Sequence, residues 1–320
     1  MDTTNNNSSN TTYAIDVQNL TVGYGSNVLM KDLNFTVNNG EIFVILGGSG
    51  CGKSSLLKNL FGLYQPLAGD VLIEGQNITA AQGAERQKIM TSFGVMYQQG
   101  ALFGSMNLLE NVTLFMEEYT ELTQDQMDLL ARCKLDLVGL LPYETYMPSE
   151  ISGGMQKRAA IARAMALDPK ILFLDEPSAG LDPITSADLE STILDLSKNL
   201  GITFVIVSHE LASIYAIADK VIMLDKGAKG IIAEGDPKVL RDTSTDPRVH
   251  QFFNRIMSKD VAWAITQIPI ISVSAYLYLL QLECLLQSSS FLDQASFLKN
   301  PLWLRPILSN LWQAWIQEPQ

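Results

Sequence analysis

Residues 41–54 of the chain, EIFVILGGSGCGKS, decide the fold. The apolar run 41–46 has no polar alternation, which is typical of a strand buried on both faces of a parallel sheet. A glycine-rich loop follows at 47–54, and GKSSLLKNLFGL (52–63) continues as a helix. The loop matches GxxxxGK[ST] in full, and a strand before it and a helix after it are the context that such a match requires. The stretch therefore predicts a phosphate-binding loop.

The chemistry of this loop points to ATP with its magnesium ion. Glycines allow backbone N–H groups to face phosphate oxygens, and the N-terminus of the following helix adds a partial positive charge. Lys53 is expected to reach the β- and γ-phosphates and the Ser54 hydroxyl to bind Mg²⁺, while Cys51 is interpreted as tolerated rather than redox-active. The residues expected to bind ATP here are Gly47, Gly48, Ser49, Gly50, Cys51, Gly52, Lys53, Ser54 and Ser55.

A second apolar run, ILFLDE (171–176), ends in two carboxylates. Asp175 is expected to hold Mg²⁺ through water. Glu176 is expected to polarise a water molecule for in-line attack on the γ-phosphate. Two acidic residues at a strand end are ordinary by themselves, and they become informative here because a complete phosphate loop accompanies them.

Further runs complete an α/β pattern. TFVIVS (203–208) and KVIMLD (220–225) are typical of buried strands, whereas VLIEG (71–75) and GIIAEG (230–235) look like strands that end in turns. Between about 105 and 150 the pattern is helical. These pieces predict one α/β core with a helical insertion and a small β-rich edge.

Composition narrows the class of protein. The chain has 320 residues, 47% of them apolar, and a formal charge of −12. A wholly disordered chain would contain fewer apolar residues. A nucleic-acid-binding protein that relies on a basic face is disfavoured because the overall field repels phosphate, and we expect no nucleic-acid partner. The three cysteines are too scattered for a disulfide framework or a metal site, which favours a reducing, cytosolic setting.

The two ends of the chain differ from its body. Residues 1–12 are polar and have no secretory signal pattern, so a disordered leader is expected. From residue 260 onward the chain has only six charged residues but all four tryptophans, and we assign 13–258 to the main domain and 259–320 to an atypical tail. Residues 261–282 are uncharged and long enough to span a bilayer, although polar residues and a proline interrupt them. The alternatives are a membrane-associated helix, a docking segment, or a sequence altered by a shifted reading frame.

ISGGMQ (151–156) distinguishes this chain from other nucleotide-binding proteins. It resembles the LSGGQ signature of ATP-binding cassette (ABC) ATPases, with mild departures, and Ser152 stands 23 residues before Asp175, as in that family. The resemblance implies an α/β fold: a P-loop NTPase core of the ABC ATPase type within 13–258. An antiparallel β edge subdomain and a helical subdomain at about 100–165 would complete it.

The signature also implies that two copies act together. Ser152 can cap the helix that follows, and Gly153 and Gly154 allow the backbone to approach an anion. By resemblance, that anion is the γ-phosphate of ATP bound to a second copy of the chain. SAGLD (178–182) matches the D-loop that crosses the dimer interface, and Asp182 is its nucleotide-site residue.

Three further residues match the family by their place in the order of motifs. Tyr24 corresponds to the aromatic residue that stacks on adenine. Gln98 corresponds to the Q-loop glutamine, which contacts Mg²⁺ and the attacking water and lies near the membrane partner, with Gln99 a weaker candidate. His209 corresponds to the switch histidine at the γ-phosphate, whereas His250 has no motif around it.

Within the family, FGVMYQQGALFGSMNLLENV (93–112) and the stretch 148–190 resemble the ATPases of Mla-type systems for the maintenance of lipid asymmetry. The resemblance implies a subunit that hydrolyses ATP to drive phospholipid transport across the cell envelope. It also implies a multi-span membrane permease, an MCE-domain lipid-binding protein and a small STAS-domain protein as partners. The chain would then be cytoplasmic and peripheral on the inner face of the inner membrane. The alternatives are an ABC importer ATPase for amino acids or other small solutes, and a soluble ABC ATPase without a transporter.

Overall fold

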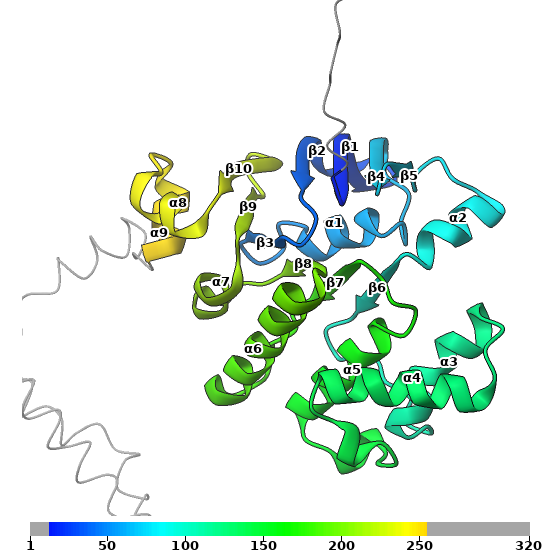
Figure 1. Ribbon diagram of the computed structural model, residues 1–320. Helices are drawn as coiled ribbons and strands as arrows, with labels where there is room; N and C mark the ends of the chain where they lie inside the picture. The colour runs from blue at the N-terminus through cyan, green and yellow to red at the C-terminus, as the bar shows by residue number, and fades with distance from the viewer. Residues whose placement is uncertain (1–12, 255–320) are drawn as a thin grey trace, which may run out of the picture. The chain divides into compact units, whose positions relative to one another are not determined.

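The apolar runs of the sequence build two β-sheets in separate layers (Figure 1). The computed structural model describes residues 13–254, so the expected leader at 1–12 and the expected tail at 259–320, with its candidate membrane span, lie outside the described residues. Among the helices of the described part, none is both long and apolar enough to cross a bilayer.

The first sheet is antiparallel and buries one face. In its central strand, Ile15 and Val17 are buried whereas Asp16 between them is partly exposed, the alternation expected of a sheet with one solvated face. Ile15 pairs with Val37 on one side and with Ile73 on the other. Its strands, in spatial order, are β2 (Asn27–Val37), β1 (Ile15–Tyr24), β4 (Ala68–Ile73) and β5 (Gln76–Asn77).

The second sheet is mainly parallel and contains the continuous apolar runs. Five of its strands are parallel, and the edge strand β10 pairs antiparallel with β9. Its strands, in spatial order, are β10 (Gly230–Gly235), β9 (Lys220–Asp225), β3 (Ile42–Gly47), β8 (Thr203–Val207), β7 (Ile171–Asp175) and β6 (Phe93–Met96). Because parallel strands end at the same edge of a sheet, the ends of β3, β7 and β8 lie close together.

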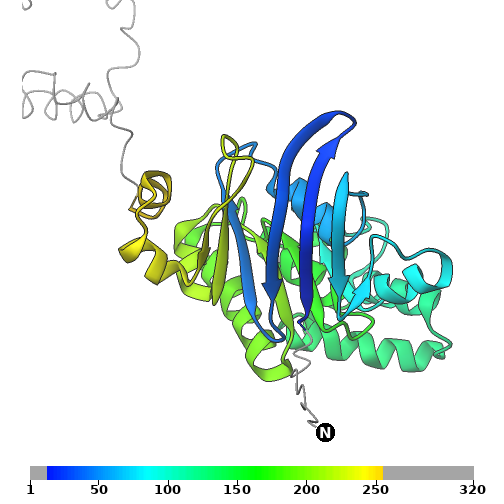
Figure 2. The same ribbon diagram turned by 90° about the horizontal axis from the view of Figure 1, so that it is seen from above.

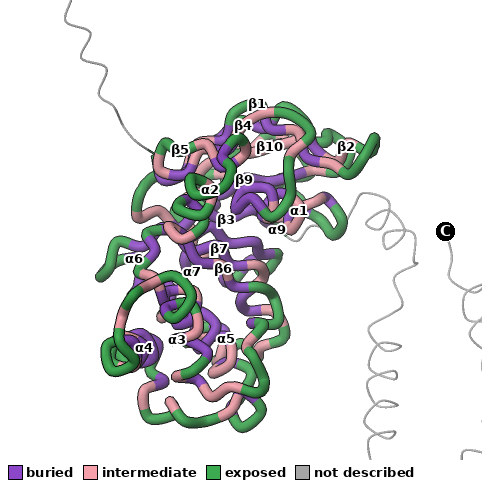
Figure 3. Tube along the Cα trace, turned by 90° about the vertical axis from the view of Figure 1, so that its right-hand side faces the viewer, coloured by how far each residue is buried: buried purple, intermediate pink, exposed green. Residues whose placement is uncertain are grey.

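Both faces of the parallel sheet are covered, and alternate residues of each strand enter different cores. Phe43 and Ile45 join a core shared with the antiparallel sheet and α1 (Lys53–Leu60). Val44 and Leu46 join a second core shared with the helices on the other face. Figure 2 looks down on the antiparallel strands above this arrangement, and Figure 3 shows the buried residues concentrated in the central strands.

A group of helices forms the insertion expected from the sequence. Asn107 caps the first of them: its Oδ1 accepts from the Glu110 N–H at 2.9 Å, and its own N–H donates to Glu110 Oε2 at 2.8 Å. The group comprises α3 (Leu108–Tyr119), α4 (Gln124–Leu137) and α5 (Gly153–Ala164), with the short helices η1 (Leu141–Tyr143) and η2 (Pro148–Glu150). The other helices are α2 (Gly83–Met90), α6 (Pro183–Leu200), α7 (Leu211–Ile217), α8 (Pro237–Thr243) and α9 (Pro247–Asn254). The predicted fold class is confirmed, because the parallel core, the antiparallel edge and the helical insertion are all present.

Candidate functional site

The loop between β3 and α1 turns so tightly that two of its positions require glycine. Gly47 has φ +147°, and a Cβ atom there would lie 2.6 Å from the carbonyl oxygen of Leu224; Gly52, directly before α1, has φ +105°. Lys53 is 8% exposed. Its Nζ donates to the carbonyl oxygens of Gly47 at 2.9 Å and Gly48 at 3.2 Å. The ammonium group therefore lies inside the loop that the sequence predicts to bind phosphate.

A cavity of about 640 Å³ opens over this loop and brings together residues from distant parts of the sequence. Glu176 follows β7 and His209 follows β8, so both reach the cavity from neighbouring strands. The lining residues are Leu29, Gly47, Gly48, Ser49, Gly50, Gly52, Lys53, Ser54, Ser55, Glu176, His209 and Phe252. A phosphate chain in this cavity would contact backbone N–H groups, a lysine and a carboxylate-bearing strand end.

Asp175 and Ser54 form the oxygen-rich part of the site. The Ser54 hydroxyl donates to Asp175 Oδ1 at 3.1 Å. Burial raises the pKa of the Asp175 carboxyl, and the hydrogen bond from Ser54 opposes that shift. Mg²⁺ prefers oxygen ligands and is usually held by one or two protein groups together with phosphates and water. These two side chains fit such an ion.

Glu176 contacts the two other residues that the sequence assigns to catalysis. Gln98 Nε2 donates to Glu176 Oε2 at 3.2 Å, and His209 Nδ1 lies 3.1 Å from Glu176 Oε1. The backbone of Glu176 has φ +48°, an uncommon conformation for a residue other than glycine. Its N–H donates to the Val207 carbonyl at 2.9 Å, which ties the end of β7 to β8. Strained backbone of this kind occurs at functional sites, where the surrounding structure holds it.

Tyr24 lies beside the loop and Cys51 lies within it, and neither is among the residues that line the cavity. Tyr24 ends β1 and is half exposed, and its hydroxyl lies 2.9 Å from Ser55 Oγ. Its ring meets Tyr64 edge to face, which leaves an exposed ring beside the loop. Cys51 is buried, and burial raises the pKa of its thiol, so its side chain serves the core rather than the ligand.

The signature residues are placed by α5 and α6. Ser152 caps α5, with its Oγ accepting from the Met155 N–H at 3.3 Å. A Cβ on Gly154 would lie 2.2 Å from Thr185 Cγ2, so glycine lets the two helices pack here without displacing the Thr185 side chain. Asp182 caps α6 through the N–H groups of Ile184 and Thr185, both at 3.1 Å.

The signature does not reach the phosphate loop of its own chain. Within residues 13–254, the cavity over that loop is lined by none of Ser152, Gly153, Gly154 and Asp182. The structure thus brings one set of predicted residues together in the cavity and leaves the signature and D-loop residues outside it.

Comparison with known proteins decides the family. The sequence model described as ABC transporter matches residues 30–179. The chain is 42% identical over 241 residues to the probable ribonucleotide transport ATP-binding protein mkl of Mycobacterium leprae, covering 75% of this chain and 69% of that protein. It is 37% identical over 242 residues to the intermembrane phospholipid transport system ATP-binding protein MlaF of Escherichia coli K12, covering 76% of this chain and 89% of MlaF.

This chain belongs to the ABC transporter ATP-binding family. Solved structures agree with the assignment. A dimeric ATP-binding cassette in a post-hydrolysis state, bound to ADP and phosphate, matches with a TM-score of 0.62 and 28% identity over 69% of this chain and 98% of its own. The cbiO1 protein of Clostridium perfringens, part of an ABC transporter complex, matches with a TM-score of 0.66 and 28% identity over 76% of this chain and 99% of its own. The chain spans 66% of mkl from Mycobacterium tuberculosis.

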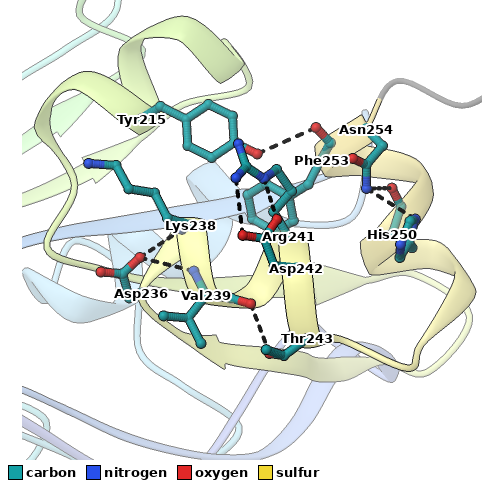
Figure 4. Close-up of polar contacts among 10 residues, drawn as sticks. All are labelled: Tyr215, Asp236, Lys238, Val239, Arg241, Asp242, Thr243, His250, Phe253 and Asn254. Atoms are coloured by element: carbon teal, nitrogen blue, oxygen red, sulfur yellow. Dashed lines mark hydrogen bonds and ion pairs between the residues drawn. The ribbon is translucent and has the colours of Figure 1, made fainter.

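In this ABC ATPase, two apolar residues that no sequence motif predicted also line the cavity. Leu29 comes from β2 and Phe252 from α9. The helix α9 is anchored through Phe253, whose carbonyl oxygen accepts from the Tyr215 hydroxyl at 3.4 Å (Figure 4). Arg241 of α8 lies over the Tyr215 ring, 5.7 Å from its centroid. Single apolar residues such as Leu29 and Phe252 belong to no recognisable motif, so only the folded structure shows that they line the cavity.

A second cavity, of about 430 Å³, was also missed and lies beside the segment that contains Gln98. Figure 1 shows α2 and α3, which both contribute to it, on the same side of the molecule. Its wall is mostly apolar and aromatic, with two arginines. The side chains that define this groove are Phe61, Leu63, Arg86, Met90, Tyr97, Phe115, Tyr119 and Arg163. Several of them are exposed, including Met90, Tyr97, Phe115 and Tyr119.

Proposed function

We propose that this chain is the ATP-hydrolysing subunit of an ABC transporter that moves phospholipid across the cell envelope. The observation that carries the ATPase function is the single cavity in which the phosphate loop, Glu176 and His209 meet. The phospholipid substrate is supported by the similarity to MlaF, because the match covers 89% of that protein.

Hydrolysis follows from the placement of the side chains around the cavity. Lys53 binds the phosphates, and Ser54 and Asp175 hold Mg²⁺, which neutralises charge on the phosphates when bound. Glu176 accepts a proton from the attacking water. Gln98, whose Nε2 donates to Glu176 Oε2, orients that water. His209 contacts the γ-phosphate and is held in place by Glu176.

Two copies of the chain form the working unit. The cavity lacks a signature from its own chain in the described residues, so Ser152, Gly153, Gly154 and Asp182 of a second copy complete it. A helix N-terminus capped by Ser152 presents N–H groups suited to the γ-phosphate. ATP therefore closes the dimer, and hydrolysis reopens it. Tyr24 stacks on the adenine of the bound nucleotide.

The apolar groove between α2 and α3 is the docking surface for a multi-span membrane permease. Exposed Phe115 and Tyr119 suit an apolar helix. The groove borders the segment of Gln98, so closure of the dimer moves the permease. A periplasmic MCE-domain lipid-binding protein and a small STAS-domain protein complete the complex, in which this chain lies at the cytoplasmic face of the inner membrane.

Transporters for the alternative substrates differ from a phospholipid transporter in their permease, whereas their ATPases share the same catalytic residues. The name of mkl assigns ribonucleotide transport to that protein, and its 42% identity to this chain makes ribonucleotide transport the second candidate. An importer of amino acids or other small solutes and a soluble ABC ATPase share the same catalytic residues. The neighbouring proteins therefore decide between these functions.

The test is a pull-down of the tagged full chain from detergent-solubilised native membranes, with mass spectrometry of the bound proteins. We expect a multi-span permease and an MCE-domain protein. A solute or nucleotide permease with a soluble binding protein would overturn the phospholipid substrate. A chain that captures no membrane protein would overturn the transporter function.

A matched pair of variants tests the groove in the same experiment. Phe115→Asp places a charge in the groove and should abolish capture of the permease. Leu129→Asp changes an equally apolar residue of the helical insertion, 63% exposed on α4 and not among the groove residues, and should leave capture unchanged. Equal capture by both variants would place the permease elsewhere.

A further inference from the structure

Two buried cations of the signature helix bind the backbone of the segment that contains Gln98. Lys157 and Arg163 both lie on α5, and each is only 7% exposed. Lys157 Nζ donates to the main-chain carbonyl of Gln98. Arg163 donates to the carbonyl oxygens of Gly100 at 2.8 Å and Ala101 at 2.6 Å. Three of four consecutive residues are thus held by a helix about 60 positions away in the sequence.

The backbone of this segment has an uncommon conformation, which the hydrogen bonds from Lys157 and Arg163 stabilise. Gly100 and Ala101 have φ of +72° and +52°, a region that a residue with a side chain seldom adopts. The Gly100 N–H donates to the Tyr97 carbonyl at 2.7 Å, which closes a turn around Gln98. Carbonyl groups of such a turn have no strand partner, and the cations of α5 satisfy them.

The position of this turn decides where the Gln98 side chain lies. Its Nε2 is 3.2 Å from Glu176 Oε2, a distance that a small shift of the Gln98 backbone would lengthen beyond a hydrogen bond. Lys157 also lies close enough to Glu176 for the two charges to interact: burial lowers the pKa of the Lys157 ammonium group, and the Glu176 charge opposes this. Burying an ammonium group is costly without partners, so the lysine depends on this arrangement.

We propose that Lys157 is a positioning residue for ATP hydrolysis, whose ammonium group fixes the backbone of Gln98 so that the Gln98 carboxamide faces Glu176. Arg163 fixes the following residues and also lines the apolar groove. Because Ser152 caps the start of α5, the signature and the turn of Gln98 move as one body. The inference rests on the proposed ATP hydrolysis and extends it to residues that no motif assigns.

The test is the steady-state kinetics of Lys157→Met in the full chain, within the complex that co-purifies with it. We expect kcat to fall about tenfold, which corresponds to about 1.4 kcal/mol of lost transition-state stabilisation. The KM for ATP should stay within about twofold, because Lys157 is not among the residues that line the nucleotide cavity. A smaller fraction of folded protein would also lower the apparent kcat at unchanged KM, so kcat is calculated per ATP-binding chain, counted by titration with ATP in the same preparation.

Arg158→Met is the matched control. Arg158 also lies on α5 and donates to a main-chain carbonyl, that of Val138 at 3.0 Å, away from Gln98. Its kcat should equal that of the wild type. Lys157→Arg keeps the charge and the donor, and it should retain most of kcat even if Lys157→Met folds poorly.

A double variant tests whether Lys157 acts through Gln98. In a Gln98→Ala background, Lys157→Met should cost little further activity, since the two changes remove one function. Independent, multiplying losses would overturn the inference, as would unchanged kcat in Lys157→Met or a loss in Lys157→Arg equal to that in Lys157→Met. Absence of hydrolysis in the wild-type complex would overturn the proposed function itself, and the inference with it.

Discussion

His209 lies against Glu176, with Nδ1 3.1 Å from Oε1, although 33 residues separate them in the sequence. The contact exists because β7 and β8 are parallel neighbours that end at the same edge of the sheet. Gln98 occupies the other oxygen of the same carboxylate at 3.2 Å. The Glu176 carboxylate therefore contacts both Gln98 and His209, the two other residues that separate motifs assign to catalysis.

Replacing Glu176 with glutamine should separate ATP binding from hydrolysis. The amide keeps the size of the side chain but cannot accept a proton, so the rate should fall at least about 100-fold. ATP should still bind, and dimers should accumulate in size-exclusion chromatography with ATP and Mg²⁺. Near-normal hydrolysis by this variant would rule out Glu176 as the base.

Replacing Lys53 with alanine should weaken ATP binding. The ammonium group now bound to the carbonyls of Gly47 and Gly48 is the cation available to the phosphates, and its loss should lower affinity about tenfold or more. A fluorescent ATP analogue would measure the change. Lys238→Ala, on the exposed face of α8, is the control and should bind normally; equal affinity of the two variants would contradict the phosphate-loop assignment.

Replacing Tyr24 should distinguish ring stacking from hydrogen bonding. Tyr24→Phe loses the 2.9 Å contact with Ser55 Oγ but keeps the exposed ring, so ATP affinity should be close to that of the wild type. Tyr24→Ala should lose about 1–3 kcal/mol of binding if the ring stacks on adenine. The same titration measures both, and a loss in the phenylalanine variant as large as that in the alanine variant would show that the hydroxyl matters instead.

Replacing Asp175 with asparagine should stabilise the nucleotide-free protein while removing hydrolysis. Burial raises the pKa of the Asp175 carboxyl, so the folded state favours the protonated form. The resulting stabilisation is present below the ordinary pKa of 3.8 and is lost as pH rises through the folded-state pKa. At neutral pH, Asp175→Asn should therefore melt higher, by at most about 2–4 °C because the side chain is partly exposed.

The pH dependence of the melting temperature tests whether the buried charge of Asp175 causes this difference. The advantage of Asp175→Asn should be full at neutral pH and shrink as the pH falls toward 3.8. Asp182→Asn is the contrasting variant, because hydrogen bonds from Thr185 and Ile184 lower the pKa of the Asp182 carboxyl. It should melt lower than the wild type at neutral pH. An Asp175→Asn advantage that is independent of pH would exclude the buried charge as its cause.

Much of the fold could be predicted because it depends on local patterns. The continuous apolar runs at 171–175, 203–208 and 220–225 became β7, β8 and β9, since short runs of this kind are typical of strands buried on both faces of a parallel sheet. The helix α2 was not predicted, as it buries only Ile89 and so has almost no apolar periodicity. Its position matters, because it forms one wall of the groove.

The candidate site divides in the same way. The sequence by itself determined the phosphate loop, the carboxylates after β7 and the histidine after β8. Each of these features directly follows a strand that can be recognised from its apolar residues. Only the tertiary structure decided that Phe252 of α9 lines the nucleotide cavity and that Lys157 and Arg163 hold the turn of Gln98. Such contacts join residues about 60 to 200 positions apart, and they depend on how packed helices bring side chains to backbone groups that have no strand or helix partner.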